Sequence, residues 1–463
     1  MIDRGRALLA RFLPQGAILL AVLTFASYLA GLVRDRVFAR TYGAGPELDA
    51  YNAAFVLPEL LLDVLVAAGL TAPFVPVFTT LRRDAPRDAG PFAQTVLTLA
   101  VAVMGIGSLL LFVAAPATVE LIAPGFDDAT RALYLDLFRL MLVTPILFAA
   151  SITLGEILVA ERRFLFYALA PILYNVGIVG GTVLLHGRIG VHAAAVGAIV
   201  GATLHLGIRL VGMARSGVRL RPRLRLRMPA LREFLRLMAP KMLAHPIEPI
   251  TFLFFTNVAS ALAAGSVTSV SFARNFQSVP VALVGVAISL AAFPSLSAVW
   301  AAGDRAAFGR LVRTNLITIS VLTVISAVLL VVLGPLAIRV LLGGGAFDAE
   351  DIQVTGTVLA AFALAVPFDA LGHLTARGLY ATHNTVLPVL ASVVGFAVTV
   401  GTTVVLVDAL GVVAIPLGFA MGTAVRTVLQ GAALAWRIRH APIPEYEPEL
   451  GAEGDDRQEA DVA

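Results

Sequence analysis

Apolar runs of about 20 residues, each long enough to cross a bilayer as a helix, follow one another along almost the whole chain. Hydrophobic residues make up 59% of the 463 residues and charged residues only 14%, whereas a soluble protein carries about 25% charged residues. So much apolar surface cannot be buried in one core. The sequence therefore predicts an all-α polytopic membrane protein and excludes a soluble enzyme or a nucleic-acid-binding domain. About twelve spans are predicted, at residues 14–33, 48–79, 92–115, 133–160, 164–185, 191–213, 234–261, 279–300, 316–333, 352–380, 386–407 and 412–436.

Arginines predict the orientation, because the cytoplasmic loops of membrane proteins carry an excess of basic residues. With the N-terminus inside, most arginines outside the spans fall in loops on that side, for example Arg82, Arg163 and Arg305. We therefore expect both termini in the cytoplasm. Arg34 and Arg36 fall on the disfavoured side just after the first span, which indicates a functional site at the membrane boundary.

A basic segment at 214–232 divides the chain into two halves. Arginine occupies every second position from Arg219 to Arg227, and we interpret the segment as a cytoplasmic linker that binds anionic lipid. A nucleic-acid contact would need interleaved aromatic residues, which the segment lacks. The predicted domains are a six-helix bundle at 1–213, this linker, a second six-helix bundle at 233–438 and an acidic, disordered tail at 439–463.

The two halves resemble each other. In the first half Gly45 is followed by Pro58 and then by the aromatic-proline segment 74–78; in the second half Gly265 is followed by Pro280 and then by 293–296. Each pattern describes a glycine turn that leads into a proline-broken helix. Internal repeats of this kind are typical of transporters whose binding site lies between the repeats.

Several ionisable residues lie inside the predicted spans, where they are costly and usually face a cavity or a partner. Asp49, Asn52, Glu59 and Asp63 share one face of the second span because their spacing follows the helical period. Two interpretations stay open for this stripe: internal ion pairs with nearby arginines, or the wall of a water-filled cavity. Glu248 lies beside prolines and is a weaker candidate for binding a coupling ion.

No catalytic motif accompanies these residues. The sequence has no cysteine, and we find no hydrolase, zinc-protease, phosphate-loop or dinucleotide signature. We therefore expect a protein that is not an enzyme, with no metal site and no cofactor; a coupling ion or the membrane potential is the candidate energy source.

Several short sequence motifs, in their order along the chain, resemble those of the MviN/MurJ family of lipid II flippases. G-L-V-R-D at 31–35 and A-P-I-L-Y-N at 170–175 are two of the matching segments. The others lie at 39–45, 48–50, 54–58, 74–76, 123–126, 155–158, 285–287, 293–297 and 377–381. The chain stops after the twelfth predicted span, where many members of the family carry two further helices.

The resemblance implies two six-helix bundles in the cytoplasmic (inner) membrane of a bacterium, with a fold related to multidrug and polysaccharide exporters. It further implies translocation of a polyprenyl-diphosphate-linked peptidoglycan precursor, lipid II, from the inner to the outer leaflet by alternating access. Arginines suit such a cargo because guanidinium groups replace the hydration of a diphosphate with charged hydrogen bonds. Membrane lipids and the cell-wall synthesis machinery are the expected partners, and nucleic acid is not.

The resemblance also implies site residues. Arg34 matches a basic cavity position of the family. Strict alignment places Asn275 at a second basic position, and Arg274 matches that position only after a shift of one residue. We predict Arg34, Arg36 and Arg274 as diphosphate contacts, and we expect Asp49 to position the outer gate by pairing with one of them. The cavity and gate residues are predicted to be Tyr28, Asp49, Asn52, Glu59, Asp63, Asn275 and Arg377.

The chain departs from the family at three positions. Tyr28 and Leu62 replace family arginines, and the acidic residue of a family A-E-G-A segment is missing from 67–69. Two alternatives therefore stay open beside the flippase. The acidic residues Glu59 and Asp63 favour a cation-coupled exporter of small cationic or amphipathic compounds, and the lost arginines permit a non-transporting scaffold in the cell envelope.

Overall fold

The computed structural model describes residues 15–64, 70–214, 216, 221–244 and 247–440, and within these residues helices form almost the whole structure. The first half contains α2 (Gln15–Tyr42), α3 (Pro46–Leu62), α4 (Thr71–Asp84), α5 (Pro86–Val113), α6 (Ala115–Ile122), α7 (Asp128–Met141), α8 (Val143–Ala160), α9 (Phe164–Ile189) and α10 (His192–Met213). The second half of the chain contains α11 (Pro229–Ala244), α12 (Ile247–Ser260), α13 (Ser266–Pro280), the π-helix η2 (Val281–Val286), α14 (Ala287–Ala301), α15 (Arg305–Leu341), α16 (Ala349–Ala363), α17 (Val366–Ala381), α18 (Val386–Leu410), the 3-10 helix η3 (Gly411–Val413) and α19 (Ala414–His440).

The helices have the length and surface of a multi-pass membrane protein. Seven helical stretches of the described residues are long and apolar enough to cross a bilayer, or eight if the bent pair α16 and α17 is one span. Large apolar side chains such as Leu184, Val332 and Val405 are more than 60% exposed on the outside of the molecule, where lipid would cover them. The predicted all-α polytopic class is confirmed, and the number of twelve spans stays a prediction.

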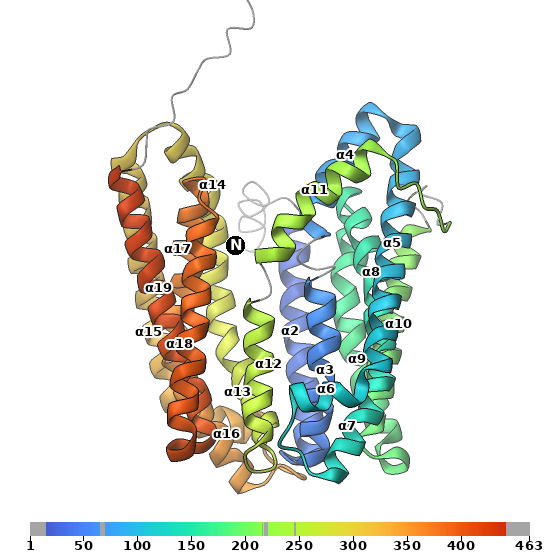
Figure 1. The fold of residues 1–463 in the computed structure, drawn as a ribbon, viewed down its shortest axis with the longest axis vertical. Helices are drawn as coiled ribbons and strands as arrows, with labels where there is room; N and C mark the ends of the chain where they lie inside the picture. The colour runs from blue at the N-terminus through green and yellow to red at the C-terminus, as the bar shows by residue number, and fades with distance from the viewer. Residues whose placement is uncertain (1–14, 65–69, 215, 217–220, 245–246, 441–463) are drawn as a thin grey trace, which may run out of the picture.

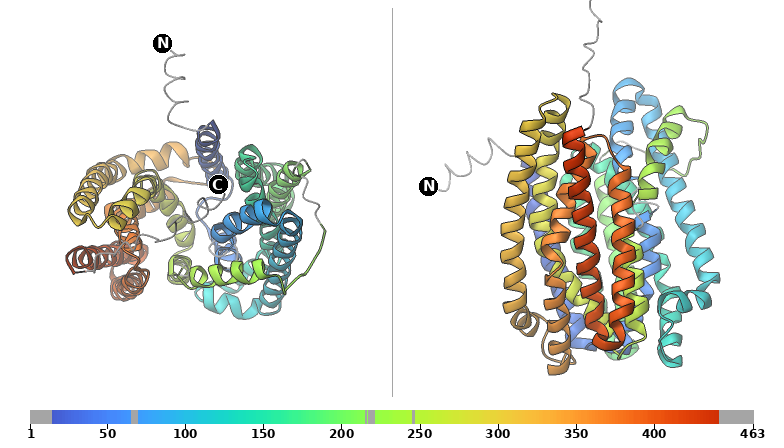
Figure 2. Two further views of the ribbon diagram at one scale, coloured as in Figure 1. Left: turned by 90° about the horizontal axis from the view of Figure 1, so that it is seen from above. Right: turned by 60° about the vertical axis from the view of Figure 1, so that its left-hand side comes forward.

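The helices form two groups that stand side by side (Figure 1; Figure 2). Helices α2 to α10 make one group, and α12 to α19 make the other. Each group ends in a pair of closely packed helices, α9 with α10 and α18 with α19. Glycines allow this close approach, because a Cβ atom on Gly177 would overlap the backbone of Gly201, and one on Gly422 would overlap the side chain of Thr399.

Helix α11 follows the linker in sequence but packs against α4 and α5 of the first group (Figure 1). Phe234 is buried against Phe74 and Phe92, with ring centroids 6.5 Å and 5.8 Å away. Before this helix, the backbone N–H groups of Arg223 and Arg225 donate to threonine hydroxyls of α5. The first group thus holds the end of the linker and the helix that follows it. The predicted domain boundaries stay a prediction.

Two helices extend further than their apolar runs predict. The first span was expected to end at Val33, but α2 continues to Tyr42; the span expected to begin at Val279 is part of a helix that begins at Ser266. Arg34 and Arg274 therefore lie inside helices, not in the outer loops where the sequence had placed them. Hydropathy alone misplaces these helix ends because it counts Arg34 and Arg274 as solvent-exposed charges, although both have partners within the protein.

Proline interrupts corresponding helices of the two halves. Helix α13 ends at Pro280 and continues as the π-helical turn η2 before α14 begins. Helix α3 contains Pro58, and π-helical residues follow its end at Leu62. Proline removes a backbone donor and crowds the preceding turn, so the hydrogen-bond ladder shifts locally. Both breaks lie next to the space between the two groups.

Candidate functional site

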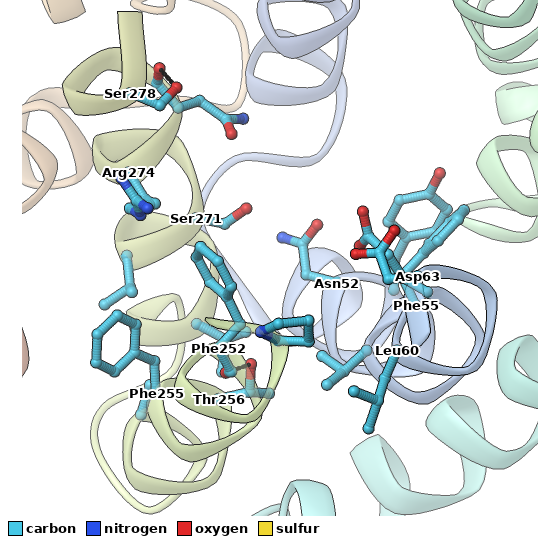
Figure 3. A pocket seen from close by; sticks show the side chains of 18 of the residues that line it. Asn52, Phe55, Leu60, Asp63, Phe252, Phe255, Thr256, Ser271, Arg274 and Ser278 are labelled. Carbon is cyan, nitrogen blue, oxygen red and sulfur yellow. Dashed lines mark hydrogen bonds between the residues drawn. The ribbon is translucent and has the colours of Figure 1, made fainter. Parts of the chain in front are cut away.

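A cavity of about 600 Å³ lies between the two groups of helices, with walls from α2, α3, α9, α12 and α13. Figure 3 shows Asn52 of α3 and Asp63, which follows α3, on one side, and Phe252 of α12 and Arg274 of α13 on the other. The charged residues that line it are Arg34, Glu59, Asp63, Glu248 and Arg274. Two cationic and three carboxylate side chains thus face one space.

Asp49 joins the two groups at one end of this cavity. Its carboxylate accepts hydrogen bonds from the backbone N–H groups of Gly265 and Thr268, both at 2.7 Å, and from the Thr268 hydroxyl at 2.6 Å. Gly265 precedes α13 with φ +87°, a conformation that favours glycine. A carboxylate at a helix N-terminus is favourable because the first N–H groups of a helix have no partner within it. Asp49 therefore acts as the cap of a helix in the other half.

A second carboxylate also joins the two halves, and here the acceptor belongs to the second half and the donor to the first. Asp351 of α16 accepts a hydrogen bond at 3.1 Å from the backbone N–H of Ala44, just before α3. Arg40 adds hydrogen bonds from α2 to the carbonyl of Gly343, at 3.0 Å and 3.2 Å. The two halves are thus connected where α2 ends and where α3 and α13 begin, and we call this region the closed end.

Arg34 of α2 faces the cavity from the first half of the molecule. Its guanidinium donates to Oδ1 of Asp35 at 2.8 Å and 3.0 Å, and the other oxygen of Asp35 accepts a hydrogen bond at 3.0 Å from Asn275 of α13. The Arg34 side chain keeps 27% of its surface exposed. Arg34, Asp35 and Asn275 therefore form a chain of polar contacts that joins α2 to α13, with part of the guanidinium still accessible.

Arg274 faces the same cavity from α13. Its guanidinium lies 5.1 Å from the ring centroid of Phe252 and 5.0 Å from that of Phe419. Its nitrogens are 3.6 Å from Glu248 and 3.8 Å from Asp369, and it donates to the side chain of Gln277. Several weak partners surround this cation, and its side chain is only 11% exposed.

The structure divides the predicted acidic stripe into two parts. Asn52, Glu59 and Asp63 line the cavity, which agrees with the interpretation of a cavity wall. Asp49 belongs to the closed end, and its partners are the backbone and hydroxyl groups of α13, not an arginine as we had expected.

Three other predicted residues lie elsewhere. Arg36 donates to the carbonyl groups of Val340 and Leu341 at the end of α15, at 2.8 Å and 3.0 Å. Tyr28 is 52% exposed on α2, and Arg377 of α17 lies 3.4 Å from the carbonyl of His373. None of the three is among the residues that line the cavity.

Sequence reasoning missed Arg426 of α19. This residue donates to Oδ1 of Asp369 at 2.9 Å, and the Asp369 side chain is only 8% exposed. The available signal was an arginine in the middle of an apolar helix, since such a charge needs a partner within the bundle. In the described residues, no group of three or more histidine or acidic side chains is arranged to hold a metal ion.

Comparison with known proteins gives the family. A family model described as lipid II flippase MurJ matches residues 38–443, which is most of the chain. The chain belongs to the MurJ family. A lipid II flippase of Burkholderia cenocepacia is 27% identical over 433 residues, covering 91% of this chain and 83% of its own length. A probable lipid II flippase of Thermotoga maritima is 28% identical over 420 residues, with 90% of this chain and 83% of that protein covered.

Solved structures show the same fold. A MurJ lipid II flippase in an inward closed conformation superposes with a TM-score of 0.78 at 23% identity, over 92% of this chain and 88% of its own. An inward-facing multidrug transporter of the MATE family also has a TM-score of 0.78, at 15% identity, over 91% of this chain and 98% of its own. The predicted all-α membrane fold is confirmed, and both solved structures share it.

Proposed function

We propose that this MurJ-family chain is a flippase that moves a polyprenyl-diphosphate-linked peptidoglycan precursor, lipid II, from the inner to the outer leaflet of the bacterial inner membrane. The observation that carries the proposal is that Arg34 and Arg274, from opposite halves of the molecule, face one cavity. Guanidinium groups on two sides of a diphosphate can form several charged hydrogen bonds to it, which replace the water it loses on leaving the membrane surface. The names of the curated relatives support the same cargo.

Alternating access is the mechanism that we propose for this movement, with the closed end opening in the course of transport. Asp49 and Asp351 hold the halves together at the closed end by accepting hydrogen bonds from three backbone N–H groups and one hydroxyl. These contacts can be exchanged for water when the halves separate. We place the closed end on the periplasmic side, with both termini in the cytoplasm, because most arginines then lie in cytoplasmic loops. The inside-negative membrane potential would favour outward movement of the anionic cargo.

The test is complementation with a direct readout. We would deplete the resident lipid II flippase of a bacterial host that expresses this chain, and measure the lipid II that becomes accessible to an externally added cleaving enzyme. We expect the chain to restore access, Arg34→Ala to abolish it, and Arg310→Ala, a change of an exposed arginine on α15, to leave it intact. Membrane levels of each variant are measured in parallel. Absence of restored access with normal membrane levels of the unmodified chain would refute the proposal.

A second candidate function is supported by Glu59 and Asp63, two carboxylates in the cavity. They suit a cation-coupled exporter of small cationic compounds, a function that the fold could also serve. The variants Glu59→Gln and Arg34→Ala distinguish the two functions, because each function depends on a different one of these two residues. Loss of ion-coupled efflux in Glu59→Gln, with efflux retained in Arg34→Ala, would favour the exporter.

A further inference from the structure

A second cavity, of about 300 Å³, lies within the α12–α19 group. Arg274, Glu248, Phe252 and Phe255 line this cavity and the central one, so they form the wall between the two. Asp369 and Arg426 line the second cavity alone. The guanidinium of Arg274 therefore stands between the space that would receive a diphosphate and a buried carboxylate.

Arg426 and Arg274 both lie near the Asp369 carboxylate, but at different distances from its oxygens. Arg426 Nη2 makes a hydrogen bond of 2.9 Å to Oδ1 of Asp369, whereas Arg274 Nη1 is 3.8 Å from Oδ2. Gln277 also approaches Oδ2, at 3.4 Å, and accepts a hydrogen bond from Arg274. Arg426 is thus the primary partner of Asp369, and Arg274 is held only at the distance of a loose ion pair.

Glycines make room for Arg426. A Cβ atom on Gly372, one helical turn after Asp369, would lie 2.9 Å from the Arg426 guanidinium, and one on Gly395 of α18 would lie 2.8 Å from its Cβ. Two neighbouring helices therefore lack side chains where this long cation passes. The fold thus accommodates Arg426 beside the buried carboxylate of Asp369, while the other acid near Arg274, Glu248, is largely exposed.

We propose that Asp369 and Arg426 form a positioning pair that controls the availability of Arg274 to the diphosphate of the cargo; this inference rests on the proposed function. Arg426 neutralises Asp369, so Arg274 is held by Gln277, by Glu248 and by two aromatic rings, and it can turn toward the central cavity. Without Arg426, the uncompensated carboxylate would hold Arg274 in a close ion pair and withdraw it from the cargo. When the diphosphate leaves, Asp369 again provides a partner for Arg274.

The experiment measures binding of farnesyl diphosphate, a short polyprenyl diphosphate, to the full-length chain in lipid nanodiscs, with farnesol as the uncharged control. We expect Arg426→Gln to weaken binding of the diphosphate by about tenfold, the factor that corresponds to one charged hydrogen bond. Arg426→Lys, which keeps the charge, should bind almost as well as the unmodified chain. The double variant Asp369→Asn with Arg426→Gln should regain most of the affinity, because no carboxylate remains to capture Arg274. Arg310→Gln is the matched control.

The outcomes separate this inference from the proposed function. If the unmodified chain does not bind farnesyl diphosphate in preference to farnesol, the diphosphate site itself is refuted. If the unmodified chain binds and Arg274→Gln binds less well, but Arg426→Gln equals the unmodified chain, the positioning pair is refuted. If Arg426→Gln does not fold, Asp369→Asn alone decides: affinity equal to or higher than that of the unmodified chain supports the inference, and a tenfold loss overturns it.

Discussion

Asp49 of α3 accepts two hydrogen bonds from Thr268 of α13, 2.7 Å from its backbone N–H and 2.6 Å from its hydroxyl, although the two residues are 219 positions apart in the chain. The carboxylate is buried and acts as a helix cap supplied by the other half of the molecule. A cap of this kind is satisfied only when the two halves are together. Asp49 therefore links the stability of one helix start to the closure of the cavity.

Removing this cap should loosen the closed end. In Asp49→Ala the N–H groups of Gly265 and Thr268 lose their acceptor, and the loss of a helix cap costs about 1 kcal/mol. We expect hydrogen exchange at the start of α13 to become about five times faster. Glu47→Gln, a change of an exposed acidic residue two positions before Asp49, is the control. Unchanged exchange in Asp49→Ala would show that other contacts alone hold this end.

A covalent link between the two halves, next to the closed end, should stop transport reversibly. Asn52 donates to the hydroxyl of Thr268 at 3.3 Å, so cysteines at these two positions lie within reach of a short thiol cross-linker. The chain has no cysteine of its own, so the introduced pair reacts without background. We expect loss of lipid II exposure on oxidation or cross-linking of the pair and recovery on reduction of the disulfide. Asn52→Cys alone should respond to neither, and continued transport in the cross-linked pair would contradict alternating access at this end.

The two repeat glycines should differ in their tolerance of alanine. Gly265 has φ +87°, and a Cβ atom there would overlap the carbonyl of Ala44, whereas Gly45 has φ −149° with open space around its Cβ position. We expect Gly265→Ala to destabilise the closed end by 1 kcal/mol or more, of order the cost of the left-handed conformation for a residue with a Cβ. Gly45→Ala should behave like the unmodified chain. Hydrogen exchange at the start of α13 compares the two variants, and equal protection would refute the assigned difference.

The contact of α11 with the first group should contribute strongly to stability. Phe234 is 2% exposed and packs against Phe74 and Phe92. Replacing a buried phenylalanine by alanine typically costs about 3–5 kcal/mol, so Phe234→Ala should lower the unfolding temperature of the purified protein by several degrees. Leu237→Ala, on the exposed side of the same helix, should change it little. An equal effect of the two variants would place α11 outside the core of the first group.

The sequence by itself determined the class of the protein, because hydropathy and helical periodicity are local properties. Apolar runs are sufficient to predict an all-α membrane protein, and the spacing of Asn52, Glu59 and Asp63 is sufficient to place them on one face, where the structure has them along the cavity. The order of short motifs was sufficient to indicate the family. None of these predictions depends on which distant segments meet.

Only the tertiary structure decided which groups satisfy one another. The sequence pattern predicts that Asp49 pairs with an arginine, but the start of α13 meets it instead. The backbone N–H groups there stabilise the carboxylate by hydrogen bonds without any charged side chain. Arg34 and Arg274 looked like loop residues because hydropathy treats each charge as exposed. In the structure Asp35 pairs with Arg34, and Arg274 lies between two carboxylates and two aromatic rings. Arg426 meets Asp369 only because α17 and α19 pack together, since the two residues are 57 positions apart in the chain. Burial of a charge depends on partners from other helices, and those partners are set by packing.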